Sequence, residues 1–187
     1  RVNRIVDLSV PLGPGTVVYP GDPVPSFRPH STIAGEGFNL LEVRMGSQTG
    51  THVDAPRHFV DGASVIADLH LHRFVGRGVV VNAIGLPPRG RITSAHVAPV
   101  LDQLGPDCIV LCRTDWGEHY GSPVWFDHPF LDAEACGSIL EAGVRTILMD
   151  VMNIDETPDE GHPGEGFPCH HLIAAVDGVI GENMTNF

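Results

Sequence analysis

The stretch DAEACGSILEAGVRTILMDV, from Asp132 to Val151, predicts a helix followed by a strand and so indicates the fold class. Its first half places the apolar residues Ala135, Ile139 and Leu140 on one side of a helix, and Gly143 stands where a helix commonly ends. Its second half, TILMDV, is a short and mainly apolar run of the kind that forms a buried strand. A helix that leads directly into a buried strand is typical of α/β proteins.

Similar patterns occur on both sides of this stretch. Thr93 or Ser94 can cap a helix that Gly105-Pro106 ends, and four prolines between Gly13 and Pro25 predict a stiff, irregular loop. The predicted strands are 1–12, Asn39–Met45, Val75–Ile84, Cys108–Arg113, Thr146–Val151 and one that starts at Val179–Ile180, and the predicted helices are Ile92–Leu104, Asp132–Gly143 and Pro168–Ala175. No repeat or linker divides the sequence, so we expect one α/β domain over residues 1–187.

The charge of the chain excludes several classes of protein. Eleven Lys and Arg residues stand against 23 Asp and Glu residues, a formal net charge of −12 at pH 7. Such an acidic chain repels nucleic acid and anionic membranes, and no apolar run approaches the roughly 20 residues of a membrane span. We therefore expect a small-molecule substrate, and neither nucleic acid nor membrane as a partner.

The four cysteines do not form a recognisable site. Cys108 and Cys112 lie on one face of a predicted strand, where neighbouring thiols point in parallel and bridge poorly. Together with Cys136 and Cys169 they match neither a zinc ribbon nor a redox CxxC spacing. Buried free thiols in a reducing cytosol are the expected state, which places the protein in the cytoplasm. No signal peptide opens the chain, in agreement with that location.

The densest chemical information lies in QTGTHVDAPRHF, which begins at Gln48. If this segment is extended, Gln48, Gly50, His52 and Asp54 project to one face, and Gly50 leaves room for an ion or a substrate. A His-x-Asp pair then offers an imidazole nitrogen and a carboxylate to the same point, which can hold a divalent ion. The alternative is a hydrogen-bonded pair without a metal. The longer string, with a second histidine at His58, favours the metal site.

His58 follows Pro56, which ends the predicted strand, so it stands on a turn near the ion but outside its ligand set. A histidine at this place can move a proton to or from water or a leaving group. A second cluster lies far downstream in His170 and His171, with Glu182 after it. Adjacent histidines point in different directions, so only one of the two is expected to join the same ion.

The remaining histidines have no predicted chemical role. His70 and His72 alternate like a ligand pair but are expected at the surface or in a structural role. Isolated histidines are expected to be solvated or to cap helices: His30, His96, His119, His128 and His162. Polar residues at strand ends, Asp115-Trp116 and Asn153-Ile154-Asp155, either shape a substrate pocket or form structural turns.

The string Gly50-Thr51-His52-Val53-Asp54-Ala55-Pro56-Arg57-His58-Phe59 resembles the signature of the cyclase family, which includes bacterial kynurenine formamidases (arylformamidases) and isatin hydrolases. The resemblance spans nearly the whole chain. It also rests on Asp7-Leu8-Ser9, on Tyr19-Pro20-Gly21-Asp22-Pro23, on Leu131 to Asp155, and on Glu182-Asn183-Met184-Thr185-Asn186.

The resemblance implies roles for individual residues. His52 and Asp54 match metal ligands, and Asp54 bridges two ions where two are bound. His58 matches the histidine that transfers protons. His170 matches the distal metal histidine, unless the turn differs by one residue and His171 replaces it. Glu182 matches a glutamate that binds metal and takes part in catalysis.

Two further positions differ from the formamidase pattern. Gln48 stands where formamidases have their first metal histidine, and its carbonyl oxygen makes manganese more favourable relative to zinc. Tyr19 occupies a place where formamidases carry a tryptophan against the aromatic ring of the substrate. The Gln48 difference weakens an assignment as a kynurenine formamidase in particular.

The implied fold is a swivelling β/β/α fold, with a mixed central β-sheet or barrel and flanking helices, and the implied assembly is a homodimer or homotetramer. The implied function is metal-dependent hydrolysis of a small amide of the N-formylkynurenine type, with a metal-activated water and His58 as the proton shuttle. Alternatives are a cyclic amide or lactone hydrolase, a biosynthetic cyclase or dehydratase, and a metal-binding protein without catalysis. His58 argues against the last, because a storage site needs no proton shuttle.

Overall fold

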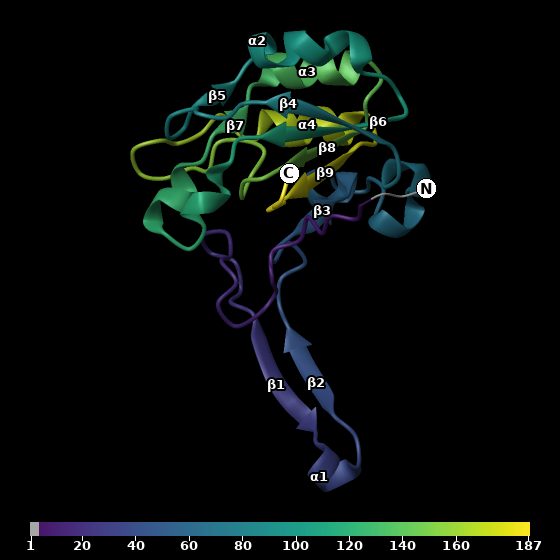
Figure 1. Cartoon of the computed structure of the whole chain (residues 1–187), viewed down its shortest axis with the longest axis vertical. Helices are drawn as coiled ribbons and strands as arrows, with labels where there is room; N and C mark the ends of the chain where they lie inside the picture. Colours follow the sequence, from purple (N-terminus) through teal and green to yellow (C-terminus); the bar gives the residue numbers. More distant parts are fainter. Residues whose placement is uncertain (1–3) are drawn as a thin grey trace.

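A five-stranded sheet forms the centre of the molecule (Figure 1). The structure is a computed structural model, and it describes residues 4–187. The sheet order is β3 (His52–Asp54), β9 (Val179–Glu182), β8 (Thr146–Met149), β6 (Cys108–Arg113) and β4 (Arg77–Asn82). Strands β9, β8, β6 and β4 run parallel, and β3 pairs antiparallel with β9 at one edge. This mixed sheet with flanking helices is the predicted α/β class.

Three helices form a layer beside the sheet. Helix α2 (Ser94–Val97) contacts β4 and α3 (Ala133–Glu141), and α3 contacts α4 (Pro168–Ala175), which in turn contacts β9. The core lies between these helices and the sheet, and Ile139 of α3 and Ile147 of β8 are both fully buried in it. The shorter elements are β5 (Arg91–Ile92), β7 (Phe130–Leu131) and the 3-10 helices η1 (Pro56–His58), η2 (Ile66–Asp68), η3 (Leu71–Arg73), η4 (Ala98–Gln103), η5 (Trp116–His119) and η6 (Pro123–Asp127).

An antiparallel ribbon extends away from this body. Strands β1 (Ser26–Ser31) and β2 (Leu40–Arg44) pair with each other alone, and the short helix α1 (Ile33–Glu36) joins them at the tip. Figure 1 shows the ribbon reaching far from the sheet. All five residues of β2 are exposed. Residues 24–45 are called the arm below.

Most predicted elements are confirmed near their predicted bounds, and β6 and α4 begin and end at the predicted residues. The predicted helix Ile92–Leu104 is α-helical only from Ser94 to Val97. It continues as the 3-10 helix η4, with Pro99 in its first turn, because proline lacks the N–H of an α-helical hydrogen bond. Strands β1, β5 and β7 were not predicted.

The predicted strand over residues 1–12 is wrong for residues 4–12, and residues 1–3 lie outside the described part. Residues 4–12 form no strand, and Ser9 makes only an isolated antiparallel bridge to Met184. Ile5, Val6 and Leu12 are exposed, and Leu8 and Val10 are only half-buried. The alternation of residues in this segment therefore does not reflect a buried face.

The lone histidine His128 corrects another prediction, since it is fully buried rather than solvated or capping. Its Nδ1 lies 2.8 Å from the carbonyl oxygen of Pro129, and its Nε2 lies 2.8 Å from Oγ1 of Thr157. A neutral ring that donates from Nδ1 and accepts at Nε2 satisfies both contacts. Burial lowers the pKa of His128 to about 4, so the ring stays neutral.

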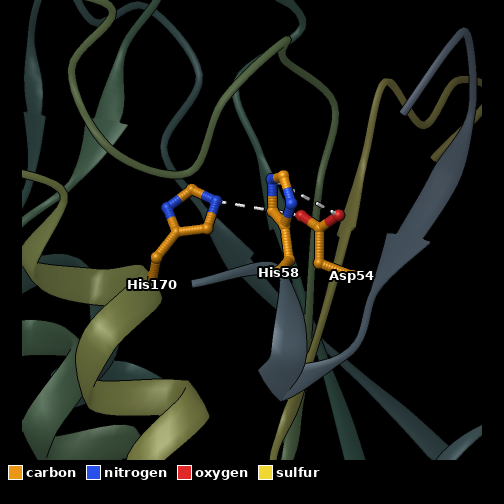
Figure 2. Close-up of side chains that lie close together, drawn as sticks. All are labelled: Asp54, His58 and His170. Atoms are coloured by element: carbon orange, nitrogen blue, oxygen red, sulfur yellow. Dashed lines mark ion pairs between the residues drawn. The ribbon is translucent and has the colours of Figure 1, made fainter. Parts of the chain in front are cut away.

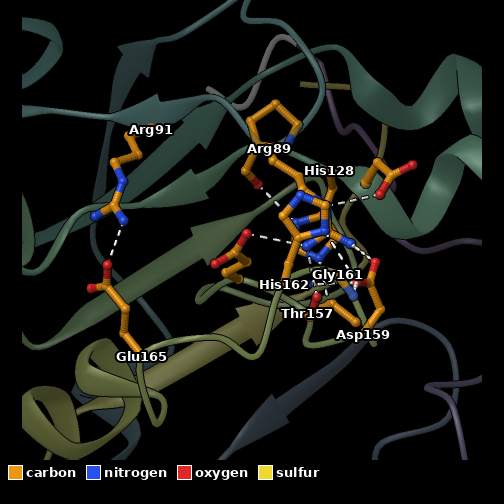
Figure 3. A network of polar contacts seen from close by, with 11 residues as sticks. Arg89, Arg91, His128, Thr157, Asp159, Gly161, His162 and Glu165 are labelled. Atoms are coloured by element: carbon orange, nitrogen blue, oxygen red, sulfur yellow. Dashed lines mark hydrogen bonds and ion pairs between the residues drawn. The ribbon is translucent and has the colours of Figure 1, made fainter.

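Arg89 ties the loop beside His128 to the body (Figure 3). Its guanidinium donates to Asp127 at 2.9 Å and to Glu156 at 3.1 Å, and it also pairs with Asp159. A second arginine, Arg91, pairs with Glu165 farther along the same loop. These contacts hold the segment that leads into α4.

Two further features concern the cysteines and the lengths of the helices. The four cysteines are buried and free, as predicted. Among residues 4–187, the helices are all too short or too polar to cross a membrane.

Candidate metal centre

The pairing of β3 with β9 brings together residues that are far apart in the sequence. His52 lies directly opposite Glu182 in this register. The Nε2 atom of His52 is 3.6 Å from Oε2 of Glu182 and 3.6 Å from Oδ1 of Asp54, which follows two residues later on β3. The predicted common face of His52 and Asp54 is therefore confirmed.

Helix α4 adds a second imidazole from the other side. Nε2 of His170 lies 3.8 Å from Oδ2 of Asp54 and 3.6 Å from Oε1 of Glu182. Each carboxylate thus presents one oxygen to each imidazole. His170 is buried, whereas His171 is exposed, so of the two adjacent histidines His170 is the one that faces the cluster.

Both imidazoles are oriented by hydrogen bonds on their far side. Nδ1 of His52 lies 2.8 Å from the carbonyl oxygen of Gly50, and Nδ1 of His170 lies 2.7 Å from Oδ2 of Asp155. A neutral ring that donates from Nδ1 has its lone pair on Nε2, and in both residues Nε2 faces the cluster. This arrangement is typical of histidines that bind metal ions.

Asp155 was not assigned this role from the sequence. Besides His170 Nδ1, it accepts the backbone N–H of Cys169 at 2.9 Å and that of His170 at 3.1 Å, so it fixes both the start of α4 and the ring. The sequence singled it out only as a polar residue at a strand end. Its position beside His170 depends on the path of the 156–167 loop.

His58 stands at the border of the cluster, on η1 (Figure 2). Its Nε2 is 4.0 Å from Oδ1 of Asp54, and its side chain is 37% exposed. Burial lowers the pKa of His58, although the charge of Asp54 opposes that shift. A partly exposed neutral imidazole beside a carboxylate can accept a proton at neutral pH.

Gln48 reaches the cluster by a path other than the predicted one. Gly50 has a φ of 69°, so the segment turns before β3 and is not extended from Gln48 onward. The amide of Gln48 nevertheless comes close, and its Nε2 donates to Oδ1 of Asp54 at 3.2 Å. Its Oε1 accepts from the hydroxyl of Ser47. The role of Gln48 as a metal ligand remains a prediction.

The charges of the cluster fit a bound cation. Burial and the negative charge of Asp54 raise the pKa of Glu182 to about 8, although His170 opposes the shift. Burial alone would lower the pKa of His170, but the hydrogen bond to Asp155 and the nearby negative charges of Asp54 and Glu182 raise it to about 9. The carboxylates therefore draw positive charge to this point.

Two buried atoms of the cluster also lack a partner. Nε2 of His52 and Oδ2 of Asp54 have no hydrogen bond among the described residues. Leaving such atoms unsatisfied is costly, and a cation would satisfy both. The side-chain atoms of His52, Asp54 and Glu182, and those of Asp54, His58 and His170, lie close enough to hold a metal ion as two overlapping groups.

A cavity of about 240 Å³ opens above the cluster. His58, His170 and Glu182 line its floor, and Tyr19 contributes to its wall. Burial and the negative charge of Glu182 raise the pKa of Tyr19, so its hydroxyl keeps its proton. The other lining residues are Asp22, Gln48, Phe59, Met152, Asn153 and Phe167. The described lining contains aromatic and acidic side chains but neither arginine nor lysine.

The sequence of this chain is similar to a family model and to known proteins. Residues 6–156 match the family described as "Putative cyclase". A kynurenine formamidase from Bacillus cytotoxicus is 30% identical over 181 residues, which cover 96% of this chain and 84% of that protein.

Solved structures are also similar. An isatin hydrolase bound to the product analogue thioisatinate matches with a TM-score of 0.84 at 20% identity, over 97% of this chain and 79% of the other, which shows a shared fold. A predicted metal-dependent hydrolase from Bacillus stearothermophilus matches with a TM-score of 0.73 at 25% identity, over 96% and 81% of the two chains.

Proposed function

Since this chain belongs to the cyclase family, we propose that it is a metal-dependent hydrolase that cleaves the amide bond of a small aromatic substrate. The observation that carries the proposal is the convergence of two imidazole Nε2 atoms and two buried carboxylates below a cavity of about 240 Å³. The relatedness to kynurenine formamidases supports the C–N bond as the target.

His52, Asp54, His170 and Glu182 would hold the divalent ion. Such an ion supplies Lewis acidity, which polarises a carbonyl oxygen and lowers the pKa of water. We propose manganese before zinc, because the carboxylates of Asp54 and Glu182 supply half of the donor set and carboxylate oxygen suits manganese. Whether one or two ions bind would follow from elemental analysis.

His58 would move the protons. It lies on the cavity side of Asp54 and is the only one of the three site histidines with a substantially exposed side chain. Its imidazole would take a proton from the attacking water and return one to the departing amine. Asp54, 4.0 Å away, would stabilise the protonated form of the ring.

The wall of the cavity favours a flat, uncharged or cationic substrate. Tyr19, Phe59 and Phe167 offer aromatic surface, and the half-buried Asp22 adds a negative charge. A substrate carboxylate would find no arginine or lysine among the described lining residues. A neutral cyclic amide, such as the isatin cleaved by the structural relatives, is therefore the second candidate.

The test begins with metal content by elemental analysis, followed by parallel assays of N-formylkynurenine, isatin and simple aryl esters. His58→Ala should keep its metal and lower the rate by roughly 10²–10⁴. Asp54→Ala should lose the metal. His70→Ala, which changes an exposed histidine away from the cluster, serves as the matched control. Metal-loaded protein that cleaves none of these substrates would refute the proposal.

We further propose that the protein works in the cytoplasm without nucleic acid or membrane as a partner. Its free, buried cysteines and its net charge of −12 support this location and this choice of partner. Measurement of the bound nucleic acid and lipid in the purified protein tests it.

A further inference from the structure

One residue of the cavity wall has an unfavourable backbone conformation. Phe167 has a φ of 59° and a ψ of 53°, which lie in the left-handed helical region. Residues with a Cβ are destabilised there, and Asn and Asp tolerate this region best. Among residues 4–187, six residues other than glycine have a positive φ. Four of them are Asp or Asn, and Phe167 is the only aromatic one. A bulky residue in this conformation indicates a functional constraint.

The path of the backbone does not explain why this residue is a phenylalanine. The same loop has two other positions with a positive φ, and both are glycine: Gly164 with a φ of 73° and Gly166 with a φ of 79°. Glycine lacks the Cβ and would fit position 167 without strain. The sequence has a phenylalanine there instead, so we expect its ring to offset the strain.

Neither helix capping nor core packing accounts for the ring. Phe167 directly precedes α4, but its side chain makes no capping hydrogen bond. The carboxylate of Asp155 accepts the N–H groups of Cys169 and His170 instead. Phe167 is only half-buried, whereas Cys169 and Ile173 of α4 are at most 1% exposed. The ring therefore serves neither the start of the helix nor the core.

The ring of Phe167 lies in the wall of the cavity above the metal centre. Its centroid is 5.3 Å from that of Phe59, at an interplanar angle of 58°, and 5.9 Å from that of His170, at 90°. Both contacts are angled, so neither neighbour stacks in parallel on the Phe167 ring. A flat ligand in the cavity can therefore stack on this ring, an arrangement that aromatic pairs favour.

Anchors on both sides hold Phe167 in its conformation. Two residues before it, the carboxylate of Glu165 pairs with Arg91 (Figure 3). After it, the first turn of α4 is fixed by the hydrogen bonds to Asp155. The short segment between these anchors has little freedom to relax, so the surrounding structure maintains the strain.

We propose that Phe167 is a specificity-determining residue, whose ring stacks on the flat ring of the substrate and whose strained backbone is kept for that purpose. This inference rests on the proposed function, because it takes the substrate to be aromatic. It adds that recognition of the ring depends on one side chain outside the predicted metal ligands. Changes at Phe167 should therefore alter the binding of aromatic molecules and leave the metal content unchanged.

The first experiment measures the binding of indole to the metal-loaded protein by isothermal titration calorimetry. Indole is flat and uncharged and has no acyl bond to cleave. The native protein and Phe167→Tyr should bind it equally well. Phe167→Leu should bind it roughly 3–10-fold more weakly, and Phe167→Gly more weakly still. The matched control is Phe74→Leu, at a half-buried phenylalanine outside the cavity lining, and it should bind like the native protein.

The second experiment measures the backbone strain by urea titration. At an ordinary position an alanine variant is more stable than a glycine variant, because glycine loses more conformational freedom on folding. At position 167 the order should be reversed, since only glycine adopts a φ of 59° without strain. Phe167→Gly should therefore unfold at a higher urea concentration than Phe167→Ala. At position 74, where φ is −109°, the alanine variant should be the more stable one.

Three results would overturn the inference. Native protein that binds no indole, or Phe167→Leu with native affinity, would show that the ring does not bind aromatic molecules. An equal loss of affinity in Phe74→Leu would show that the effect is not specific to the cavity. A Phe167→Ala variant at least as stable as Phe167→Gly would show that the position is not strained. Neither experiment involves hydrolysis, so a protein with both effects that cleaves no substrate would refute only the proposed function.

Discussion

The central sheet and the arm use the same alternation of apolar residues with opposite results. In β6, every second residue is buried, and Ile147 of the neighbouring β8 is 0% exposed. In β2, apolar residues alternate in the same way, but all five residues of the strand are exposed. The sheet therefore completes its own core. The arm carries the same pattern on a strand that pairs only with β1, so its apolar side chains stay exposed.

Removing side-chain volume from the sheet should have the largest effect on stability. Ile147→Ala leaves a cavity in the buried core, and we expect a loss of about 2–5 kcal/mol in the free energy of unfolding. Urea titration measures it. A loss below about 1 kcal/mol would show that the sheet is packed more loosely than its burial indicates.

Acid should weaken the body through His128. Burial lowers its pKa to about 4 in the folded protein, whereas the unfolded chain takes up the proton near 6.5. Because the unfolded state binds more protons between these values, stability is lost as the pH falls through this window. We expect His128 to account for a loss of about 2 kcal/mol in the free energy of unfolding between pH 7 and pH 5.

The measurement is the free energy of unfolding at both pH values, compared with His128→Asn. The asparagine variant should lack this share of the pH dependence, whatever its stability at pH 7. An unchanged difference between the two pH values in the variant would assign the acid sensitivity to other groups.

A smaller effect is expected from Asp155, which holds His170 on the side away from the cluster. Asp155→Asn removes the charge that orients His170 and should weaken metal binding by roughly 10–100-fold. Competition with a chelator measures the affinity. Glu160→Gln, at an exposed acidic residue of the same loop, should keep the native affinity. Equal affinities for all three proteins would mean that the contact to Asp155 has no influence on metal binding.

The smallest effect is expected in the arm. Leu41→Ala removes an exposed side chain, so the free energy of unfolding should change by no more than about 0.5 kcal/mol. Urea titration measures the change, as for Ile147→Ala. A loss comparable to that of Ile147→Ala would remove the distinction between the two regions.

The contrast between the sheet and the arm also explains which strands and helices could be predicted from the sequence. Strand β6 and helix α4 were found in the sequence because their apolar residues face a core of the same chain. Strand β1, SFRPHS, was missed because arginine, proline and histidine interrupt its pattern and no core selects its residues. The segment 4–12 was overpredicted because its apolar residues have no sheet to join.

For the site, the residues on β3 and its turn were identified from spacing and resemblance. His52, Asp54 and His58 are near neighbours in sequence, and the structure gathers them with His170 and Glu182. Asp155 and the burial of His128 could not be inferred. Both depend on the loop that Arg89 holds, and contacts across such a loop leave no local signal in the sequence.

The position of β9 within the sheet has a consequence for synthesis on the ribosome. β9 lies between β3 and β8, although β3 is made far earlier. His52 must therefore wait for Glu182, its partner across 130 residues, to emerge before the sheet can close around it. Until then β3 has no strand to pair with, and no metal can find its full set of ligands. The four side chains of the cluster can thus meet only after β9 has been made, and a metal ion held by all four would report that β9 has joined the sheet.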